Sequence, residues 1–310
     1  MKRREFLGYS SAFLGATLAF GTFGTQILAA DSKDFFTNTQ GANMQYVTLN
    51  NGLKMPLLGF GTYDIKSIDT FLAAVDCGYR LFDSAQMYGN QKEVVAAIRE
   101  AIRSRGLKRE EFFITTKLSS DMDFESAKKS IESSLKALDI GYIDLLLIHA
   151  PYTQAKEMYK AMELAYKEGT IKALGISSFT PKVYLEFIKT CEIMPAINQC
   201  ETHIYYQQRA LLEEMKPYGT ILESWSPFIA GKSGFFSNPT LRQIASAYNK
   251  SVAQIALRFL VQQGIIAIPK ASKLKHMQEN INVFDFSLSA ADMESIRALD
   301  KNKTQFSWGY

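Results

Sequence analysis

Four residues that can donate, stabilise or orient a proton stand where short apolar runs of this sequence end. Asp83, Lys117 and His149 each follow such a run directly, and Tyr88 comes shortly after Asp83. A phenol has an ordinary pKa of about 10, which is too high for an efficient acid near neutrality. A buried ammonium beside it would favour the phenolate and lower that pKa. The set therefore predicts proton donation from Tyr88 to a carbonyl oxygen during hydride transfer.

Each of these residues also has a purely structural interpretation. Alone, Asp83 could cap a helix and Lys117 could be a solvated loop charge. His149 could be a core histidine, and Tyr88 could be a packing aromatic. A charged lysine that follows a buried strand needs a partner, however. Because the set stands at consecutive strand ends, the catalytic interpretation is favoured for the four together.

The elements that would position these residues follow from the alternation of apolar runs and amphipathic segments after residue 44. Segments 93–102 and 127–138 carry apolar residues three and four positions apart, which predicts helices. Alternating strands and helices predict parallel strands joined by crossover helices. The apolar runs that predict strands are 57–61, 80–82, 112–116, 143–148, 171–176, 196–198, 221–223 and 265–268.

Eight such units favour an α/β fold, a closed (β/α)8 TIM barrel, whose chemistry lies at the carboxyl ends of the strands. The alternative is a doubly wound dinucleotide-binding sheet, which would show a Gly-x-Gly-x-x-Gly turn after an early strand. Residues 59–64 read Gly-Phe-Gly-Thr-Tyr-Asp and lack the third glycine. Residues 44–55, centred on Asn50-Asn51-Gly52, predict an N-terminal β-hairpin at the bottom of the barrel.

The composition fits a globular protein and argues against two kinds of partner. Of the 310 residues, 47% are hydrophobic and 21% are charged, and the formal net charge is +4. No segment clusters lysine and arginine strongly enough to suggest binding of a nucleic acid. The three histidines lie in unrelated segments, so no metal site is expected. We expect a monomer that acts on a small-molecule carbonyl substrate.

The first thirty residues resemble an export signal. A basic start precedes a moderately apolar run, and Arg3-Arg4-Glu5-Phe6-Leu7 resembles the twin-arginine signal, which a receptor recognises. A stable membrane anchor is the alternative, but it needs about 20 predominantly apolar residues, and glycine and threonine interrupt this run. We expect the export machinery as a partner and the periplasm as the location, or the cytoplasm if the signal is not cleaved. The expected divisions are a signal peptide at 1–30, a flexible N-terminus at 31–44 and the barrel at 45–310.

The segments around the four residues resemble those of the aldo-keto reductase family. Residues 83–90 read Asp-Ser-Ala-Gln-Met-Tyr-Gly-Asn, which is similar to the family motif Asp-x-Ala-x-x-Tyr-Gly-Asn. Thr116-Lys117-Leu118 and Leu147-Ile148-His149 are similar to the segments that carry the other two members of the family's catalytic tetrad. The resemblance extends from about Val47 to Asp300.

This resemblance implies the reversible, NADPH-dependent reduction of an aldehyde or ketone to an alcohol. It implies that Tyr88 is the acid, that Lys117 and Asp83 tune it, and that His149 orients the substrate. A nicotinamide-binding sensor or partner subunit with little turnover is the alternative on the same fold. The intact tetrad argues against that alternative, because a protein that only binds need not keep Tyr88.

The resemblance also implies a cofactor site. Gly175-Ile176-Ser177-Ser178-Phe179 resembles the family's Gly-Val-Ser-Asn-Phe, in which Ser and Asn hold the nicotinamide carboxamide together with a later Gln. Ser178 replaces the Asn, and Trp225 replaces the usual Tyr that stacks on the ring. The resemblance of residues 268–272 to Ile-Pro-Lys-Ser favours NADP(H) over NAD(H). The expected cofactor contacts are Gly61, Thr62, Ser177, Ser178, Gln199, Trp225, Ser226, Pro227, Lys270, Ser272, Lys273, His276, Glu279 and Asn280.

The substrate side departs from the family pattern. Ser119 and Ala150 each stand where the family usually has Trp, and Tyr63 is a candidate replacement wall. Loss of two aromatic walls predicts a wider and less apolar mouth. This favours a polar or bulky carbonyl compound, such as a sugar or a keto acid, over a small aromatic aldehyde.

Overall fold

The computed structural model describes residues 37–38 and 44–306. The contacts divide the chain into Met1–Lys33 and Asp34–Tyr310, and all described residues belong to the second unit. The signal-peptide prediction for 1–30 lies outside the described residues. In the part that is described, no helix is long and apolar enough to cross a membrane.

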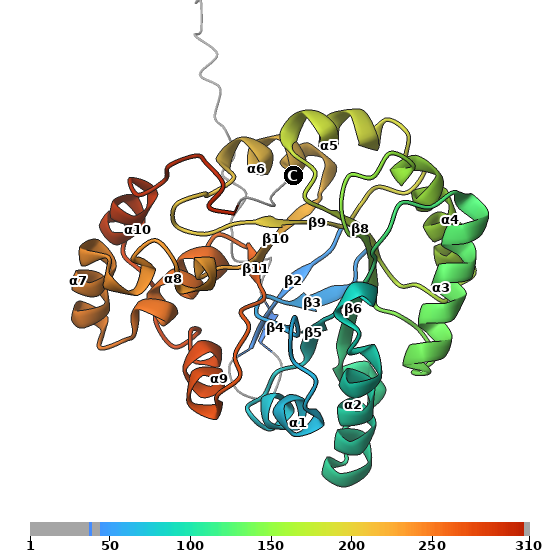
Figure 1. The fold of residues 1–310 in the computed structure, drawn as a ribbon. Coiled ribbons are helices and arrows are strands. Elements are labelled where there is room, and N and C mark those ends of the chain that lie inside the picture. Colours follow the sequence, from blue (N-terminus) through green and yellow to red (C-terminus); the bar gives the residue numbers. More distant parts are fainter. Residues whose placement is uncertain (1–36, 39–43, 307–310) are drawn as a thin grey trace, which may run out of the picture. The chain divides into compact units, whose positions relative to one another are not determined.

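Eight parallel strands, each paired with the next in chain order, form the central sheet (Figure 1). The strands are buried on both faces, as the apolar runs predict. They are β4 (Phe60–Gly61), β5 (Leu81–Asp83), β6 (Phe113–Leu118), β7 (Leu145–Ile148), β8 (Leu174–Ser177), β9 (Ile197–Glu201), β10 (Ile221–Trp225) and β11 (Ile266–Ala267).

The first and last strands meet, so the sheet closes on itself. Leu58 and Ala267 form a parallel bridge, and Gly59 N donates to Ala267 O at 2.8 Å. Gly61 requires the absence of a side chain here, because a Cβ atom would lie 2.6 Å from Ile268 O. The prediction of a (β/α)8 barrel is confirmed.

Helices lie around the barrel (Figure 1). The last of those joining two strands, α8, is buried along nearly its whole length because α7 packs outside it. Tyr248 Oη at the end of α7 donates to Asp292 Oδ2 in α10 at 2.7 Å. The helices are α1 (Ile68–Asp76), α2 (Gln91–Arg105), α3 (Phe124–Leu138), α4 (Ala155–Lys167), α5 (Pro181–Ile188), α6 (Arg209–Met215), α7 (Pro239–Tyr248), α8 (Val252–Val261), α9 (Leu274–Ile281) and α10 (Ala290–Arg297).

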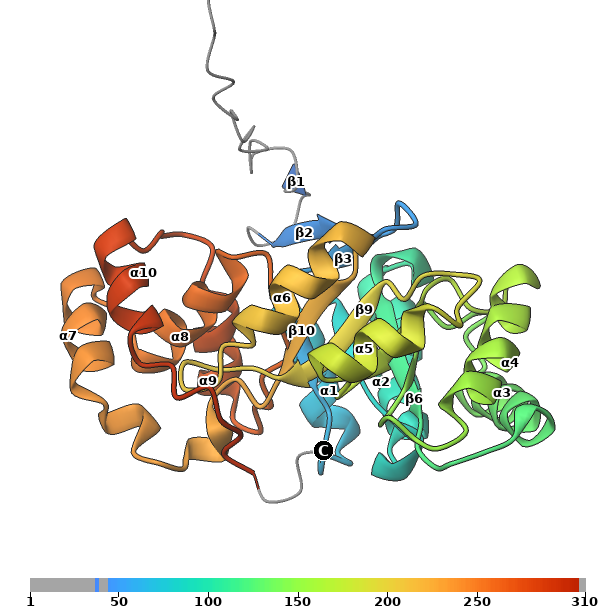
Figure 2. The same cartoon turned by 90° about the horizontal axis from the view of Figure 1, so that it is seen from above.

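The predicted hairpin is formed by β2 (Gln45–Thr48) and β3 (Lys54–Pro56), as Figure 2 shows. Asn51 Nδ2 donates to the carbonyl oxygen of Lys172, just before β8, and Asn50 Nδ2 donates to that of Pro195, just before β9. The hairpin therefore lies at the amino ends of the strands. β1 (Thr37–Asn38) adds a third strand that pairs with β2, within a segment for which no strand was predicted.

Candidate active site

The four predicted catalytic residues lie at the carboxyl ends of three neighbouring strands. Asp83 is the last residue of β5, Lys117 lies near the end of β6, and His149 directly follows β7. Tyr88 ends the short helix η2 (Gln86–Tyr88), which follows β5. Because these strands are adjacent in the barrel, the side chains meet at one rim.

Lys117 is the centre of this group. Its fully buried Nζ donates to Asp83 Oδ1 at 2.5 Å and to Ser84 O at 3.0 Å, and it lies 3.4 Å from Tyr88 Oη. Burial acts to lower the pKa of Lys117, but the interactions with Asp83, Tyr88 and Glu223 together outweigh burial, and the pKa is raised above its ordinary value. The ammonium is therefore charged at neutral pH and is held beside the phenol.

The pKa of Tyr88 shifts in the direction opposite to the one expected from the sequence. Burial raises the pKa of this phenol, and the Lys117 ammonium lowers it by less. The Nζ–Oη distance of 3.4 Å is long for a hydrogen bond that involves a charged group, which limits the effect of the ammonium. Tyr88 thus carries its proton at neutral pH, while Lys117 is placed to stabilise a phenolate when one forms.

His149 is in contact with Ser119. The Ser119 hydroxyl oxygen lies 3.0 Å from His149 Nδ1 and accepts a hydrogen bond from Met87 N at 3.3 Å. Burial, followed by the charge of Lys117, lowers the pKa of His149 to about 3, so its ring is neutral near pH 7. When the serine hydroxyl donates to Nδ1, Nε2 carries the hydrogen and can donate it to a substrate oxygen.

Gln199 connects this group to a second buried carboxyl group, which the sequence analysis did not single out as functional. Gln199 Nε2 donates to Asp83 Oδ2 and to Glu223 Oε2, each at 2.8 Å. Glu223 is fully buried in β10, and its Oε1 has no hydrogen-bond partner in the described part of the chain. Burial first, and then the Asp83 carboxylate, raises the pKa of Glu223 to about 8. The signal available in the sequence was a glutamate within the apolar run 221–223.

The loop after β4 holds the backbone of Asp83 in place. Thr62 is fully buried, and its hydroxyl donates to Asp83 O at 2.8 Å. Asn90 Nδ2 donates to Thr62 O at 2.7 Å and to Ile65 O at 2.9 Å, and Ser84 Oγ donates to Asn90 Oδ1 at 2.8 Å. The side chain of Thr62, predicted as a cofactor contact, is thus engaged within the protein. Asn90 and Ser84 are supporting residues for which the sequence offered only their place in the motif.

The residues expected to hold a nicotinamide carboxamide lie together at the ends of β8 and β9. Ser177 Oγ and Ser178 N both donate to Gln199 O, each at 2.9 Å. Both hydrogens on Gln199 Nε2 are engaged by the two carboxyl groups, which leaves Oε1 as the other polar atom of this side chain. That oxygen is an acceptor of the kind that a carboxamide nitrogen requires, so Gln199 fits the amino group of a nicotinamide.

The neighbouring end of β10 provides an aromatic face. Trp225 is partly exposed and is followed by Ser226, whose φ of +53° lies in the left-handed region, and by buried Pro227. The Trp225 ring lies 5.4 Å from the ring of Phe306 near the end of the described chain. An indole held in this way can stack on a flat ring.

Cations surround the start of α9, where a phosphate is expected. Lys270 is exposed and donates to Asp64 Oδ2 at 3.0 Å across the barrel closure. Exposed cations near the start of a helix are a suitable environment for an anion. The other residues predicted here are exposed Ser272, Lys273 and His276, half-buried Glu279 and buried Asn280.

The three residues predicted to line the substrate pocket differ in their exposure to solvent. Tyr63 is 61% exposed, and its ring lies 5.2 Å from that of Tyr88, so it can form a wall. Ser119 is half-buried against His149. Ala150 is only 1% exposed and lies below the surface of the mouth.

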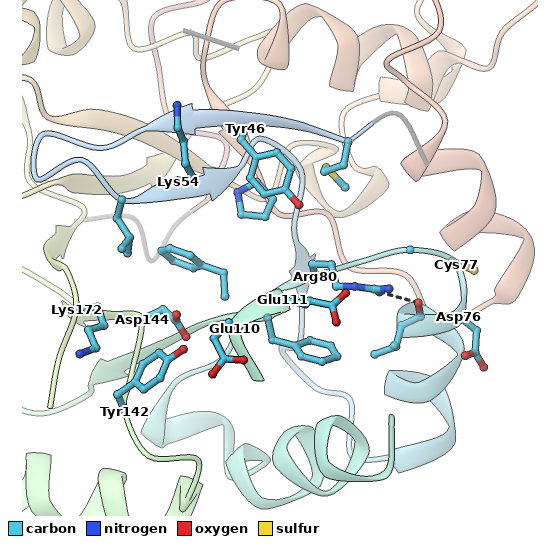
Figure 3. A pocket seen from close by; sticks show the side chains of 17 residues that line it. Tyr46, Lys54, Asp76, Cys77, Arg80, Glu110, Glu111, Tyr142, Asp144 and Lys172 are labelled. Atoms are coloured by element: carbon cyan, nitrogen blue, oxygen red, sulfur yellow. Dashed lines mark hydrogen bonds between the residues drawn. The ribbon is translucent and has the colours of Figure 1, made fainter. Parts of the chain in front are cut away.

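A cavity of about 750 Å³ lies at the opposite end of the barrel. Figure 3 shows Tyr46 and Lys54 of the hairpin on one side of it, and Arg80 and Asp144 on the other. None of the four predicted catalytic residues lines it. Within the described ranges, no group of three histidine, cysteine or acidic residues is arranged to hold a metal ion.

Comparison with known proteins agrees with this arrangement. Residues 58–301 match the model of the Aldo/keto reductase family. Glyoxal reductase of Bacillus subtilis is 39% identical over 263 residues, covering 83% of this chain and 93% of that protein. The chain belongs to the aldo/keto reductase family. The family prediction is therefore confirmed, and with it an NADP-dependent oxidoreductase.

Solved structures of other aldo/keto reductases agree with the fold. One from a deep-sea metagenome library is 37% identical, with a TM-score of 0.81, and the match covers 85% of this chain and 98% of that one. The Bombyx mori aldo-keto reductase in complex with NADP is 30% identical, with a TM-score of 0.79, and the match covers 85% of this chain and 95% of that one. Aldo/keto reductases act on small carbonyl compounds and generally use NADP(H).

Proposed function

We propose that this aldo/keto reductase reduces an aldehyde or ketone to an alcohol with a proton from Tyr88. The observation that carries the proposal is the fully buried Lys117 Nζ, which lies 2.5 Å from Asp83 Oδ1 and 3.4 Å from Tyr88 Oη. When bound, NADPH supplies the hydride to the carbonyl carbon. Tyr88 gives its proton to the carbonyl oxygen, which completes the alcohol, and the reverse steps oxidise it.

The chain's own residues prepare this proton transfer. Tyr88 keeps its proton at neutral pH because burial raises its pKa. The phenolate left after the transfer lies beside the Lys117 ammonium, which Asp83 holds in place and keeps charged. Because these charges are already oriented, little reorganisation is needed when the proton leaves. Neutral His149 directs the substrate oxygen towards Tyr88 through a hydrogen bond from Nε2.

The cofactor is held by two sets of residues in this proposal. Ser177, Ser178 and Gln199 bind the carboxamide, and Trp225 stacks on the ring. Lys270 and Lys273 bind the 2′-phosphate, which favours NADP(H) over NAD(H). The Lys270–Asp64 ion pair is largely exposed, so a phosphate can replace the carboxylate at low energetic cost.

The substrate is a polar or bulky carbonyl compound in this proposal. Ser119 and Ala150 provide no aromatic wall, and Tyr63 is the exposed aromatic beside Tyr88. A mouth of this kind encloses a small aromatic aldehyde poorly and leaves room for a hydroxylated chain.

Two measurements on the purified protein test the proposal. Oxidation of NADPH and of NADH is followed with sugars, keto acids, dicarbonyl compounds and aromatic aldehydes, and the two cofactors are titrated without substrate. We expect carbonyl-dependent oxidation, a lower KM for NADPH and the highest kcat/KM with polar carbonyls. Binding of NADPH without turnover of any carbonyl would instead favour a sensor or partner subunit. Equal KM values for the two cofactors would contradict the roles of Lys270 and Lys273.

We also propose that the protein is exported by the twin-arginine route after folding. The support is the Arg3-Arg4-Glu5-Phe6-Leu7 segment, together with a nucleotide that is made in the cytoplasm and must be bound before export. Fractionation of cells that express the full chain tests this, with Arg3→Lys and Arg4→Lys combined as the control. Mature protein found only in the cytoplasm would overturn the proposal.

A further inference from the structure

Glu223 is a buried carboxyl group that takes no part in the proton transfer proposed above. It is fully buried in β10, and one of its oxygens, Oε1, has no hydrogen-bond partner among the described residues. The other oxygen accepts a hydrogen bond from Gln199 Nε2 at 2.8 Å. Burial of a carboxylate is costly unless its oxygens are hydrogen-bonded or its charge is compensated. A carboxyl group in this position therefore requires a physical reason.

The charges around Glu223 are not balanced. Its neighbour on β9 is Gln199, and its neighbour on β11 is Ile266, so neither adjacent strand offers a cation. The charged groups that act on it from the other strands are Asp83 on β5 and Lys117 on β6. With both carboxyl groups ionised, one lysine would face two negative charges in a buried space. Burial and the Asp83 carboxylate accordingly raise the pKa of Glu223 to about 8.

The missing positive charge is one that the cofactor acquires during the reaction. The nicotinamide ring is neutral when reduced and cationic when oxidised. Gln199, which binds the carboxamide in the proposed function, is also the residue that contacts Glu223. The carboxyl group is therefore separated from the proposed carboxamide site by a single side chain. A charge that appears at this distance in a buried site shifts a neighbouring ionisation equilibrium.

We propose that Glu223 changes its protonation with the redox state of the bound cofactor, being neutral beside NADPH and ionised beside NADP⁺. This inference rests on the proposed function, because it requires the cofactor to be bound at Gln199. When the hydride leaves the ring, the ring gains a positive charge and Glu223 releases its proton to solvent. In the reverse direction Glu223 takes up a proton as the ring becomes neutral. Glu223 acts by balancing the charge of the bound cofactor, and it does not touch the substrate.

The test is the pH dependence of the ratio of two dissociation constants. The affinities for NADP⁺ and NADPH are measured by fluorescence titration of the purified full chain from pH 6 to 9. Groups that meet the 2′-phosphate affect both cofactors alike and cancel in the ratio. We expect the dissociation constant of NADP⁺ relative to NADPH to fall about tenfold or more with rising pH, because one unit of pKa shift is a tenfold change in affinity.

Glu223→Gln removes the ionisation and preserves the shape of the side chain, so it should make this ratio independent of pH. Glu163→Gln is the matched control, because Glu163 is a buried glutamate in α4 that accepts hydrogen bonds from Glu192 N and Ile193 N, away from the site. The control should keep the wild-type slope. A flat ratio in the wild type, or an unchanged slope in Glu223→Gln, would overturn the inference. Failure of both nucleotides to bind would instead overturn the proposed function.

A second measurement needs no variant and covers the case in which Glu223→Gln does not fold. The infrared spectrum of the wild-type protein is recorded near pH 7.5 with NADPH and then with NADP⁺. We expect a protonated carboxyl band with NADPH that is lost with NADP⁺. The same carboxyl band in both states would contradict the proposed change.

Discussion

Each end of the barrel contains an ion pair, partly buried at the amino end and fully buried at the carboxyl end, and the two pairs use their donors differently. At the amino end, Arg109 donates to Asp144 and to the carbonyl oxygens of Ile140, Phe112 and Tyr142. All of these partners are structural. At the carboxyl end, Lys117 donates to a carboxylate and a carbonyl, and its third contact is a phenol, which can ionise. The two pairs therefore differ in one contact of the cation: Lys117 contacts a phenol hydroxyl, which can ionise, and Arg109 has no phenol hydroxyl among these hydrogen-bond partners.

The end of the barrel that contains the cavity is not the end that contains the catalytic tetrad. The cavity of about 750 Å³ lies at the amino end, where Asp144 and Arg80 line it. The tetrad lies at the other end, and the pKa values of Tyr88, Lys117 and His149 are shifted there. A buried charge with a reactive neighbour therefore locates the candidate active site better than an open volume does.

The largest effect should come from Tyr88→Phe. Removal of a general acid lowers kcat by about 10²–10⁴-fold. Tyr142→Phe, at the opposite end, should change kcat by less than about twofold, since Tyr142 lines the cavity and packs against Arg109 and Lys172 there. Steady-state NADPH oxidation measures both, with NADPH titration as a check on binding. Comparable rates for Tyr88→Phe and wild type would remove Tyr88 as the acid.

Breaking either ion pair should lower stability, but only the break at the carboxyl end should lower activity. Lys117→Met and Arg109→Met each leave an uncompensated buried carboxylate, which costs about 3–5 kcal/mol of unfolding free energy. Well below the unfolding temperature, we expect Arg109→Met to keep its activity and Lys117→Met to lose about 10²-fold or more in kcat. Denaturant unfolding and kcat are measured on the same samples. Equal loss of kcat in both variants would mean that the pairs differ only in location.

Ser119→Ala should have an intermediate effect. The change removes the 3.0 Å contact with His149 Nδ1, so the tautomer with a hydrogen on Nε2 loses its support. We expect a loss of about tenfold in kcat/KM, carried mainly by KM, because substrate orientation suffers and the acid remains. Ser119→Thr, which retains a hydroxyl group, should recover much of the loss. Full activity in Ser119→Ala would show that the histidine needs no such partner.

The hairpin at the amino end should affect stability and leave catalysis unchanged. Asn51→Ala removes the 2.8 Å hydrogen bond to Lys172 O, which is worth about 0.5–1 kcal/mol at an exposed position. The urea midpoint should fall slightly, and kcat should stay at the wild-type value. A loss of activity beyond the unfolded fraction would contradict the separation of the two ends.

The smallest of these effects should be the response of His149 when the pH is lowered from 7 to 5. Its pKa is lowered to about 3, so the ring stays neutral over this range, whereas an ordinary histidine would become charged. NMR titration of the ring protons, assigned with His149→Asn, should show no inflection between pH 5 and 7. An inflection near pH 6.5 would show that burial and Lys117 do not suppress the charge.

Much of the fold followed from local pattern. The eight strands were predicted within a few residues, because strands buried on both faces are continuous apolar runs. The hairpin followed from Asn50-Asn51-Gly52, whose glycine has a φ of +86°. β1 was not predicted, since its pairing with β2 depends on a partner in space.

The sequence by itself determined which residues could perform the chemistry: Asp83, Tyr88, Lys117 and His149 are identified by residue type and by their place after apolar runs. Tertiary structure alone decided how they are tuned. The rise in the pKa of Tyr88, the contact of Ser119 with His149 and the link from Gln199 to Glu223 depend on side chains far apart in the chain. The physical reason is that a pKa reflects how much water every neighbour displaces and which charges remain nearby.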